Sequence, residues 1–250
     1  MLRITADGKS DIGKVRQSNQ DAFACDKDQH LYVVADGMGG HSGGEVASRK
    51  AVEALQTAFN EEITLSSDSD ANGSRDTPLV RSIEAANNRV FQMASEDRKL
   101  QGMGTTLVAL RVVGSNASIG WVGDSRIYLW RDGRLRQMSR DHSLVNEYVR
   151  LGTLSAEEAS THPLKHIISR AVGVHPTVEV DHLVIPLQAN DLFILCTDGL
   201  TNMLDNEDIR ATLIAVGNQP SALCAEFITR ANAKGGLDNI TVVAVHCDSV

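Results

Sequence analysis

Acidic side chains stand at the ends of strand-like apolar runs in this sequence. Three such runs end in an aspartate, and a fourth run begins just after one; the residues are Asp36, Asp124, Asp198 and Asp238. In an antiparallel sheet, the end of one strand lies beside the start of its neighbour. We therefore expect these carboxylates to share one rim of a core.

Carboxylates that lie close together repel one another, and each raises the pKa of the others unless cations are present. A set of oxygen ligands without His or Cys favours magnesium or manganese over zinc or copper. Each aspartate alone could be a turn residue, because Asp-Gly is a favoured turn dipeptide. Four of them at the ends of apolar runs together favour a metal site.

Glycines surround the first of these aspartates and precede a predicted helix; they are Gly37, Gly39, Gly40, Gly43 and Gly44. Glycine-rich turns let backbone carbonyls approach a metal and leave room for a phosphoryl group. A nucleotide-binding P-loop is excluded, because no Gly-Lys-Ser/Thr follows.

The elements that must position these residues are visible in the apolar pattern. Runs of strand length cover residues 31–35, 106–113, 117–122, 126–130, 191–197 and 240–247. A capping box at Ser42–Glu45 begins one helix, and Thr77-Pro78 begins another. Two further helices are expected between Asp205 and Lys234. Strands in series with helices in two blocks predict an α+β layered fold.

Two polar segments interrupt this pattern. Residues 66–76 are interpreted as a surface loop within one domain that spans residues 1–250. Residues 140–173 carry short helical pieces and are interpreted as an inserted flap. Lys165, His166 and Arg170 give this flap local positive charge.

Composition excludes several classes of function. The 24 basic and 32 acidic residues give a net charge of −8, which argues against nucleic-acid binding. No apolar run approaches the roughly 18 residues that span a bilayer, and the N-terminus lacks the pattern of a signal peptide. The four cysteines show no C-x-x-C spacing. We expect a cytoplasmic protein that does not bind membranes.

Six short motifs rich in polar and glycine residues follow one another along the chain. They are Arg16-Gln17-Ser18-Asn19-Gln20-Asp21, Val34-Ala35-Asp36-Gly37-Met38-Gly39-Gly40-His41, Met103-Gly104-Thr105-Thr106, Val122-Gly123-Asp124-Ser125-Arg126, Cys196-Thr197-Asp198-Gly199-Leu200 and Asp238-Asn239-Ile240-Thr241. Through them the chain, from about Ile12 to Val245, resembles the compact bacterial members of the type 2C (PPM) family of metal-dependent serine/threonine phosphatases.

The resemblance implies an α-β-β-α sandwich of four layers, with two central antiparallel sheets and a flap. It implies that Asp36 bridges two Mn²⁺ or Mg²⁺ ions, with the Gly37 carbonyl on one ion and Asp198 and Asp238 on the other. Asp124 with Asp198 would match a third ion.

The resemblance also implies roles for residues around the metals. Arg16 would hold the substrate phosphate, and Gln20, Asp21 and Asn239 would lie behind the metal ligands. Gln20 stands where many members have Glu, so its contact would pass through water. Met38 replaces a histidine proposed as general acid in the animal enzymes, which leaves His41 or a metal-coordinated water as candidates.

The implied reaction is hydrolysis of phosphoserine and phosphothreonine in proteins, by direct attack of a hydroxide that bridges the two ions. The expected partners are phosphoproteins made by a eukaryotic-like Ser/Thr kinase, and the chain is expected to be a monomer. One alternative is a cysteine-dependent phosphatase using the C-x5-R match Cys224–Arg230, although that stretch has a helical apolar face. The other is a catalytically inactive phosphatase-like binding or sensor domain, which usually lacks some of the metal-site carboxylates.

Overall fold

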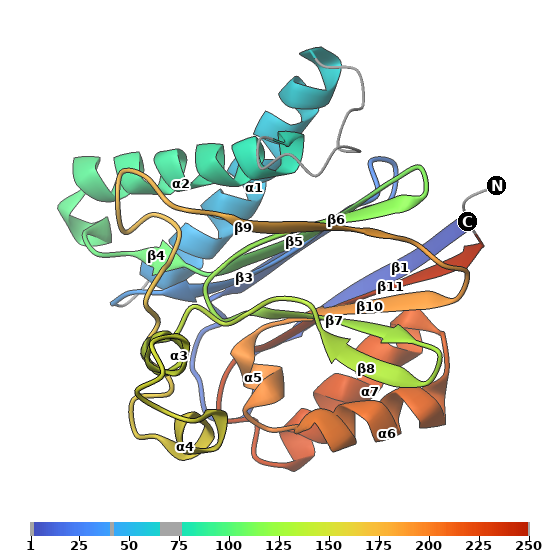
Figure 1. The fold of residues 1–250 in the computed structure, drawn as a ribbon. Coiled ribbons are helices and arrows are strands. Elements are labelled where there is room, and N and C mark those ends of the chain that lie inside the picture. The colour runs from blue at the N-terminus through green and yellow to red at the C-terminus, as the bar shows by residue number, and fades with distance from the viewer. Residues whose placement is uncertain (1–2, 41–42, 66–76, 250) are drawn as a thin grey trace.

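The computed structural model describes residues 3–40, 43–65 and 77–249. Two antiparallel sheets lie face to face, with helices outside each (Figure 1). The first sheet has the order β1 (Arg3–Asp11), β11 (Ile240–Ser249), β10 (Asp191–Cys196), β7 (Arg126–Arg131) and β8 (Arg134–Gln137). The second has the order β2 (Asp21–Asp26), β3 (Leu31–Met38), β5 (Leu107–Val113), β6 (Asn116–Val122) and β9 (Asp181–Pro186), and β4 (Gly104–Thr105) pairs with β3.

The helices fall into three groups. The second sheet is covered by α1 (Gly43–Leu65) and α2 (Pro78–Glu96), and a short 3-10 helix, η2 (Arg98–Leu100), follows. The first sheet is covered by α5 (Asp198–Thr201), α6 (Asn206–Val216) and α7 (Pro220–Ala233). The helices α3 (Leu144–Arg150) and α4 (Ala156–Thr161) lie at one end of the sandwich, opposite the two chain termini (Figure 1).

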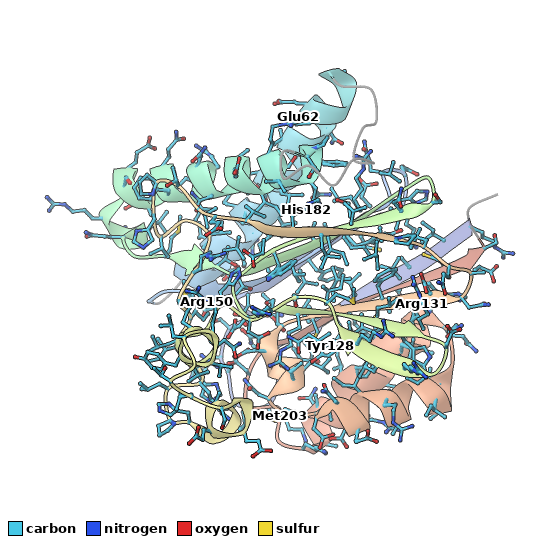
Figure 2. The ribbon with its side chains drawn as sticks, viewed as in Figure 1. Glu62, Tyr128, Arg131, Arg150, His182 and Met203 are labelled. Carbon is cyan, nitrogen blue, oxygen red and sulfur yellow. The ribbon has the colours of Figure 1, made fainter. Side chains whose placement is uncertain are left out.

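Alternate side chains of each central strand enter different cores. In β3, Val33 packs under α1 and α2, whereas Val34 faces the other sheet. In β7, Tyr128 enters the core beneath α6 and α7 (Figure 2), whereas Leu129 faces the second sheet. A strand buried on both faces has few polar positions, which explains the continuous apolar runs in the sequence. The predicted α+β sandwich of four layers is thus confirmed.

The elements predicted from the apolar pattern are present, with ends that differ by a few residues. Thr77 caps α2 by accepting a hydrogen bond from the Val80 N–H, and Pro78 is the first helical residue, as expected. The capping residue Ser42, the loop 66–76 and His41 lie outside the described residues. No helix among the described residues is long and apolar enough to cross a membrane.

Candidate functional site

The five acidic residues of the motifs lie close to one another. Asp21 and Asp36 are direct partners across β2 and β3. Asp198 follows β10 at the start of α5, and Asp238 precedes β11, the strand paired with β10. Burial raises the pKa of Asp36 well above its ordinary value, and so do the charges of its neighbours, which are Asp21, Asp198, Asp124 and Asp238. The structure therefore brings together the carboxylates that the sequence analysis singled out.

Other carboxyl groups of this cluster also have raised pKa values. Burial, followed by the charges of Asp198 and Asp141, raises the pKa of Asp124 to about 7. Burial and the neighbouring Asp238 raise the pKa of Asp198. Mutual repulsion of this kind is relieved by bound positive charge, so the electrostatics of the cluster suit a divalent cation.

Two oxygens of the cluster are buried without a hydrogen-bond partner in the described part of the chain, Asp21 Oδ1 and Asp198 Oδ1. A buried acceptor left unpaired costs free energy, and a cation would satisfy it. Within residues 3–40, 43–65 and 77–249, no three Asp, Glu, His or Cys side chains are arranged to hold one ion together. Magnesium commonly takes only one or two carboxylates and completes its shell with water and phosphate oxygens, so the residues present fit such an ion.

The backbone of Asp36 is fixed by the Gly104-Thr105-Thr106 motif. The Asp36 N–H donates to Thr106 Oγ1 at 2.9 Å, and Thr105 Oγ1 donates to the Asp36 carbonyl at 2.8 Å. The hydroxyls of Thr106 and Ser125 are 2.6 Å apart, and Ser125 follows Asp124. A chain of hydrogen bonds thus joins the turns that carry Asp36 and Asp124.

Two glycines allow neighbouring elements to approach the cluster closely. A Cβ atom on Gly37 would lie 2.0 Å from the Gly44 carbonyl oxygen, at the start of α1. A Cβ atom on Gly199 would lie 1.9 Å from the Asn239 carbonyl oxygen. Any side chain at either position would push a helix away from the strand beside it.

The loop of residues 12–20 carries Arg16 to the edge of the cluster. Arg16 Nη2 lies 2.7 Å from Asp238 Oδ2, and the Arg16 side chain is 51% exposed. Asn239 Nδ2 donates to the carbonyls of Ile12 and Ser18, both at 2.9 Å. Asn239 therefore holds this loop beside Asp238.

Gln20 acts through its backbone as well as lying near the ligands. Its N–H donates to Asn239 Oδ1 at 2.8 Å, and its carbonyl accepts from the Gly37 N–H at 3.0 Å and from Ser48 Oγ at 2.6 Å. These bonds tie the loop to β3, α1 and the start of β11. These backbone contacts of Gln20 were not predicted from the sequence.

Two threonines whose role was not predicted from the sequence hold the side chain of Asp21. Thr197 and Thr241 donate to Asp21 Oδ2 at 2.9 and 2.7 Å. Burial raises the pKa of Asp21 to about 7, although these two hydrogen bonds lower it. The available signal was a hydroxyl residue inside an apolar run, directly before Asp198 and shortly after Asp238.

A cavity of about 730 Å³ opens beside Asp124 and Asp198. Its wall is completed by Arg126, Gln137 and some of the residues in the segments 139–166 and 201–206. Lys165 and His166 line this cavity. Arg170 is not part of this wall. Its Nη1 contacts Asp181 Oδ1 at 2.8 Å and its Nη2 contacts Glu179 at 3.4 Å. Of the three basic residues predicted to give the flap positive charge, Lys165 and His166 therefore face the cavity, whereas Arg170 forms ion pairs with Asp181 and Glu179.

The cysteine alternative does not fit the structure. Cys224 is fully buried in α7, and burial raises the pKa of its thiol to about 12. Arg230 Nε contacts Glu226 at 2.6 Å on the same helix. A neutral buried thiol on a helix cannot serve as a nucleophile for phosphate.

Comparisons with known proteins agree with this geometry. The profile of the family described as protein phosphatase 2C matches residues 8–229. The serine/threonine phosphatase stp of Listeria monocytogenes serovar 1/2a is 42% identical over 246 residues, which cover 97% of this chain and 96% of that protein.

Solved structures are similar over the same length. The serine/threonine phosphatase PstP/Ppp of Mycobacterium tuberculosis has a TM-score of 0.87 and 33% identity, covering 99% of this chain and 100% of that one. The catalytic domain of the phosphatase PstP in complex with 2 manganese ions has a TM-score of 0.83 and 33% identity, covering 98% of this chain and 99% of that one.

Proposed function

The chain belongs to the protein phosphatase 2C family, and we propose that its carboxylate cluster removes phosphate from phosphoserine and phosphothreonine in proteins. The family predicted from the six motifs is confirmed. So is activity as a metal-dependent serine/threonine phosphatase rather than an inactive sensor domain. The observation that carries the residue assignments is the buried cluster itself, in which charges raise one another's pKa and two oxygens have no partner among the described residues.

In this proposal Asp36, Asp198 and Asp238, together with the Gly37 carbonyl, would hold two Mn²⁺ or Mg²⁺ ions, and Asp124 with Asp198 would hold a third. When bound, such ions neutralise phosphate charge and lower the pKa of a coordinated water from 15.7 toward about 7. The unpartnered Asp198 Oδ1 and the raised pKa of Asp124 support these assignments. The manganese-bound relative supports the choice of metal.

Arg16 is proposed to bind the substrate phosphate. Its planar guanidinium can donate two parallel hydrogen bonds to phosphate oxygens. Its position supports this role, because it lies at the edge of the cluster, half exposed and held against Asp238. Asn239 keeps the Arg16 loop in place, and Asp21 joins the turns of Asp198 and Asp238 through Thr197 and Thr241.

The remaining assignments follow the sequence. His41 as general acid stays a hypothesis. We propose a monomer that acts in the cytoplasm on phosphoproteins made by a eukaryotic-like Ser/Thr kinase. All four cysteines are free, which suits a reducing compartment.

The test is turnover of p-nitrophenyl phosphate and of a phosphothreonine peptide by metal-stripped protein, with and without Mn²⁺. We expect activity only with the metal, and no turnover by Asp36→Ala. Asp28→Ala removes an exposed carboxylate in the turn after β2, at the other end of that strand from Asp21; it is the matched control and should keep wild-type activity. Near wild-type kcat for Asp36→Ala in saturating Mn²⁺ would refute the proposed site.

A further inference from the structure

The ring of His142 is buried beside the turn that carries Asp124. The residue is only 4% exposed. The ring Nδ1 accepts a hydrogen bond from the Gly123 N–H at 3.1 Å. The backbone N–H of His142 donates to the Gly123 carbonyl at 2.9 Å. Both polar backbone groups of Gly123, the residue directly before Asp124, are therefore bonded to His142.

Gly123 has a backbone conformation that needs such support. Its φ is +103°, which residues with a Cβ rarely adopt, and a Cβ there would lie 2.7 Å from Thr106 Cβ. The peptide at this turn sets the direction in which the next side chain leaves the strand. The contacts of His142 thus act one residue away from Asp124.

The far side of the ring is also fixed. A backbone N–H can only donate, so Nδ1 is unprotonated and the neutral ring carries its proton on Nε2. Nε2 lies 3.3 Å from Asp181 Oδ2, and Arg170 Nη1 lies 2.8 Å from Asp181 Oδ1. Arg170 Nη1 is also 3.2 Å from Nε2, but two donors cannot bond, so Asp181 is the acceptor that both share. Burial lowers the pKa of His142, in keeping with a neutral ring.

The main chain of His142 also makes a hydrogen bond, which must be distinguished from the contact made by its side chain. The main-chain carbonyl of His142 accepts from the Ser169 N–H at 2.8 Å and so joins the two ends of the segment 140–173. Any residue at position 142 could make this bond. The hydrogen bond from the Gly123 N–H, by contrast, is accepted by the side chain, through Nδ1. A replacement residue must therefore carry an acceptor atom at the same position to keep it.

We propose that His142 is a positioning residue for Asp124, holding the Gly123 peptide so that the Asp124 carboxylate can bind a divalent cation together with Asp198. The proposal rests on the assignment of Asp124 and Asp198 made above. Groups that orient metal ligands typically change metal affinity by about 10- to 100-fold when they are removed.

Two variants of matched size separate the acceptor from packing. In His142→Asn, Oδ1 takes the place of Nδ1 and can still accept from the Gly123 N–H. The leucine of His142→Leu has nearly the same shape as asparagine but carries no acceptor. Both variants lose the Nε2 contact and the stacking of the ring on Trp121. Binding of Mn²⁺ to the metal-stripped full chain would be measured by the EPR signal of free Mn²⁺. We expect the weakest binding class to lose about 10- to 100-fold in His142→Leu and to stay within about threefold of wild type in His142→Asn.

A double-mutant cycle shows whether the effect passes through Asp124. His142→Leu in an Asp124→Ala background should bind Mn²⁺ as Asp124→Ala alone does. Equal Mn²⁺ binding by His142→Asn and His142→Leu, or an undiminished loss in the Asp124→Ala background, would overturn the positioning role while leaving the phosphatase assignment intact. A wild-type chain that neither binds Mn²⁺ nor hydrolyses p-nitrophenyl phosphate would instead overturn both.

Discussion

Arg16 and Asp238 are separated by 222 residues in the sequence, and their side chains meet at 2.7 Å. Replacing Arg16 with Ala removes a charge-assisted contact to the phosphate, worth about 1.5–3 kcal/mol. We expect kcat/KM for p-nitrophenyl phosphate to fall roughly ten- to over a hundredfold, mainly through KM. Steady-state kinetics at saturating Mn²⁺ would measure this.

Lys14→Ala is the control for the Arg16 variant, because Lys14 is an exposed cation on the same loop. It changes the net charge equally but should leave kcat/KM near the wild-type value. An Arg16→Ala enzyme with unchanged kcat/KM would remove Arg16 from the phosphate site.

Asp124 gives the metal-free protein a characteristic dependence of stability on pH. Its pKa is raised from 3.8 to about 7, so between these values the folded state binds more protons than the unfolded state. The stabilisation from protonated Asp124 is fully present below pH 3.8 and is lost as pH rises through about 7. In EDTA, Asp124→Asn should therefore exceed wild type at pH 8 by more than about 1 kcal/mol in free energy of unfolding, with the gap closing toward pH 4.

Urea unfolding from pH 4 to pH 8 measures this difference. Glu61→Gln, which removes an exposed carboxylate on α1, should show no such trend. A gap between Asp124→Asn and wild type that is the same at both ends of the pH range would contradict the repulsion argument.

The residues differ in how far the sequence could predict them. Asp36 and Asp198 each end an apolar run and Asp238 stands just before one, so the local pattern, with antiparallel pairing of the strands, indicated that they meet. The hydrogen bonds from Thr197 and Thr241 to Asp21 join residues of two different sheets. They depend on which strands pair and on how the two sheets face each other, and local periodicity does not carry this information. The contact of His142 with Gly123 went unpredicted for the same reason.

At the scale of elements, the strands that were not predicted from the sequence are the two-residue β4 and β1, β2 and β9, which are three of the four edges of the two sheets. An edge strand has polar neighbours and partly exposed faces, so its sequence lacks a continuous apolar run. β1 illustrates this, because Ala6 is its only buried residue among Arg3–Asp11. The buried central strands were all predicted.

The flap segment, residues 140–173, is expected to affect choice of protein substrate. Lys165 lines the cavity beside Asp124 and Asp198, where its charge can attract an anionic phosphopeptide. Lys165→Ala should lower kcat/KM for a phosphothreonine peptide about two- to fivefold and leave p-nitrophenyl phosphate unchanged. Arg170→Ala should instead lower the unfolding temperature, because it leaves Asp181 without its ion pair.

Arg150→Ala provides the matched control for Lys165→Ala. Arg150 lies on α3 (Figure 2), is paired with Glu147 and lines a different cavity. It should leave both substrates near wild-type rates. Equal losses on peptide and small substrate for Lys165→Ala would place Lys165 at the reaction centre instead.

At the scale of the whole molecule, bound metal should stabilise the fold. A ligand that binds only the folded state at 100 times its Kd adds about 2.7 kcal/mol. We expect Mn²⁺ to raise the unfolding temperature of the wild type in calorimetry and to do so much less for Asp238→Ala. Asp28→Ala should respond as wild type does, and an equal rise in Asp238→Ala would contradict its assignment as a ligand.

The layered arrangement was predicted at two levels. Strands in series and helices in two blocks gave an α+β fold from the residues alone, whereas the facing sheets came from the family resemblance. The pairing of β1 with β11 shows why, since their partner residues run from Arg3 and Ser249 to Asp11 and Ile240. Nothing in either segment's own pattern identifies so distant a partner.

The position of β11 between β1 and β10 has a consequence for the order of folding. Pairing β11 with β1 closes a loop of more than two hundred residues, and the entropy of closing long loops slows folding. The hairpins β5–β6 and β7–β8 and the pair α1–α2 have local contacts and can form first. Because Asp238 and the Arg16 loop meet only when β11 is in place, regain of activity after dilution from denaturant should lag behind regain of helical circular dichroism.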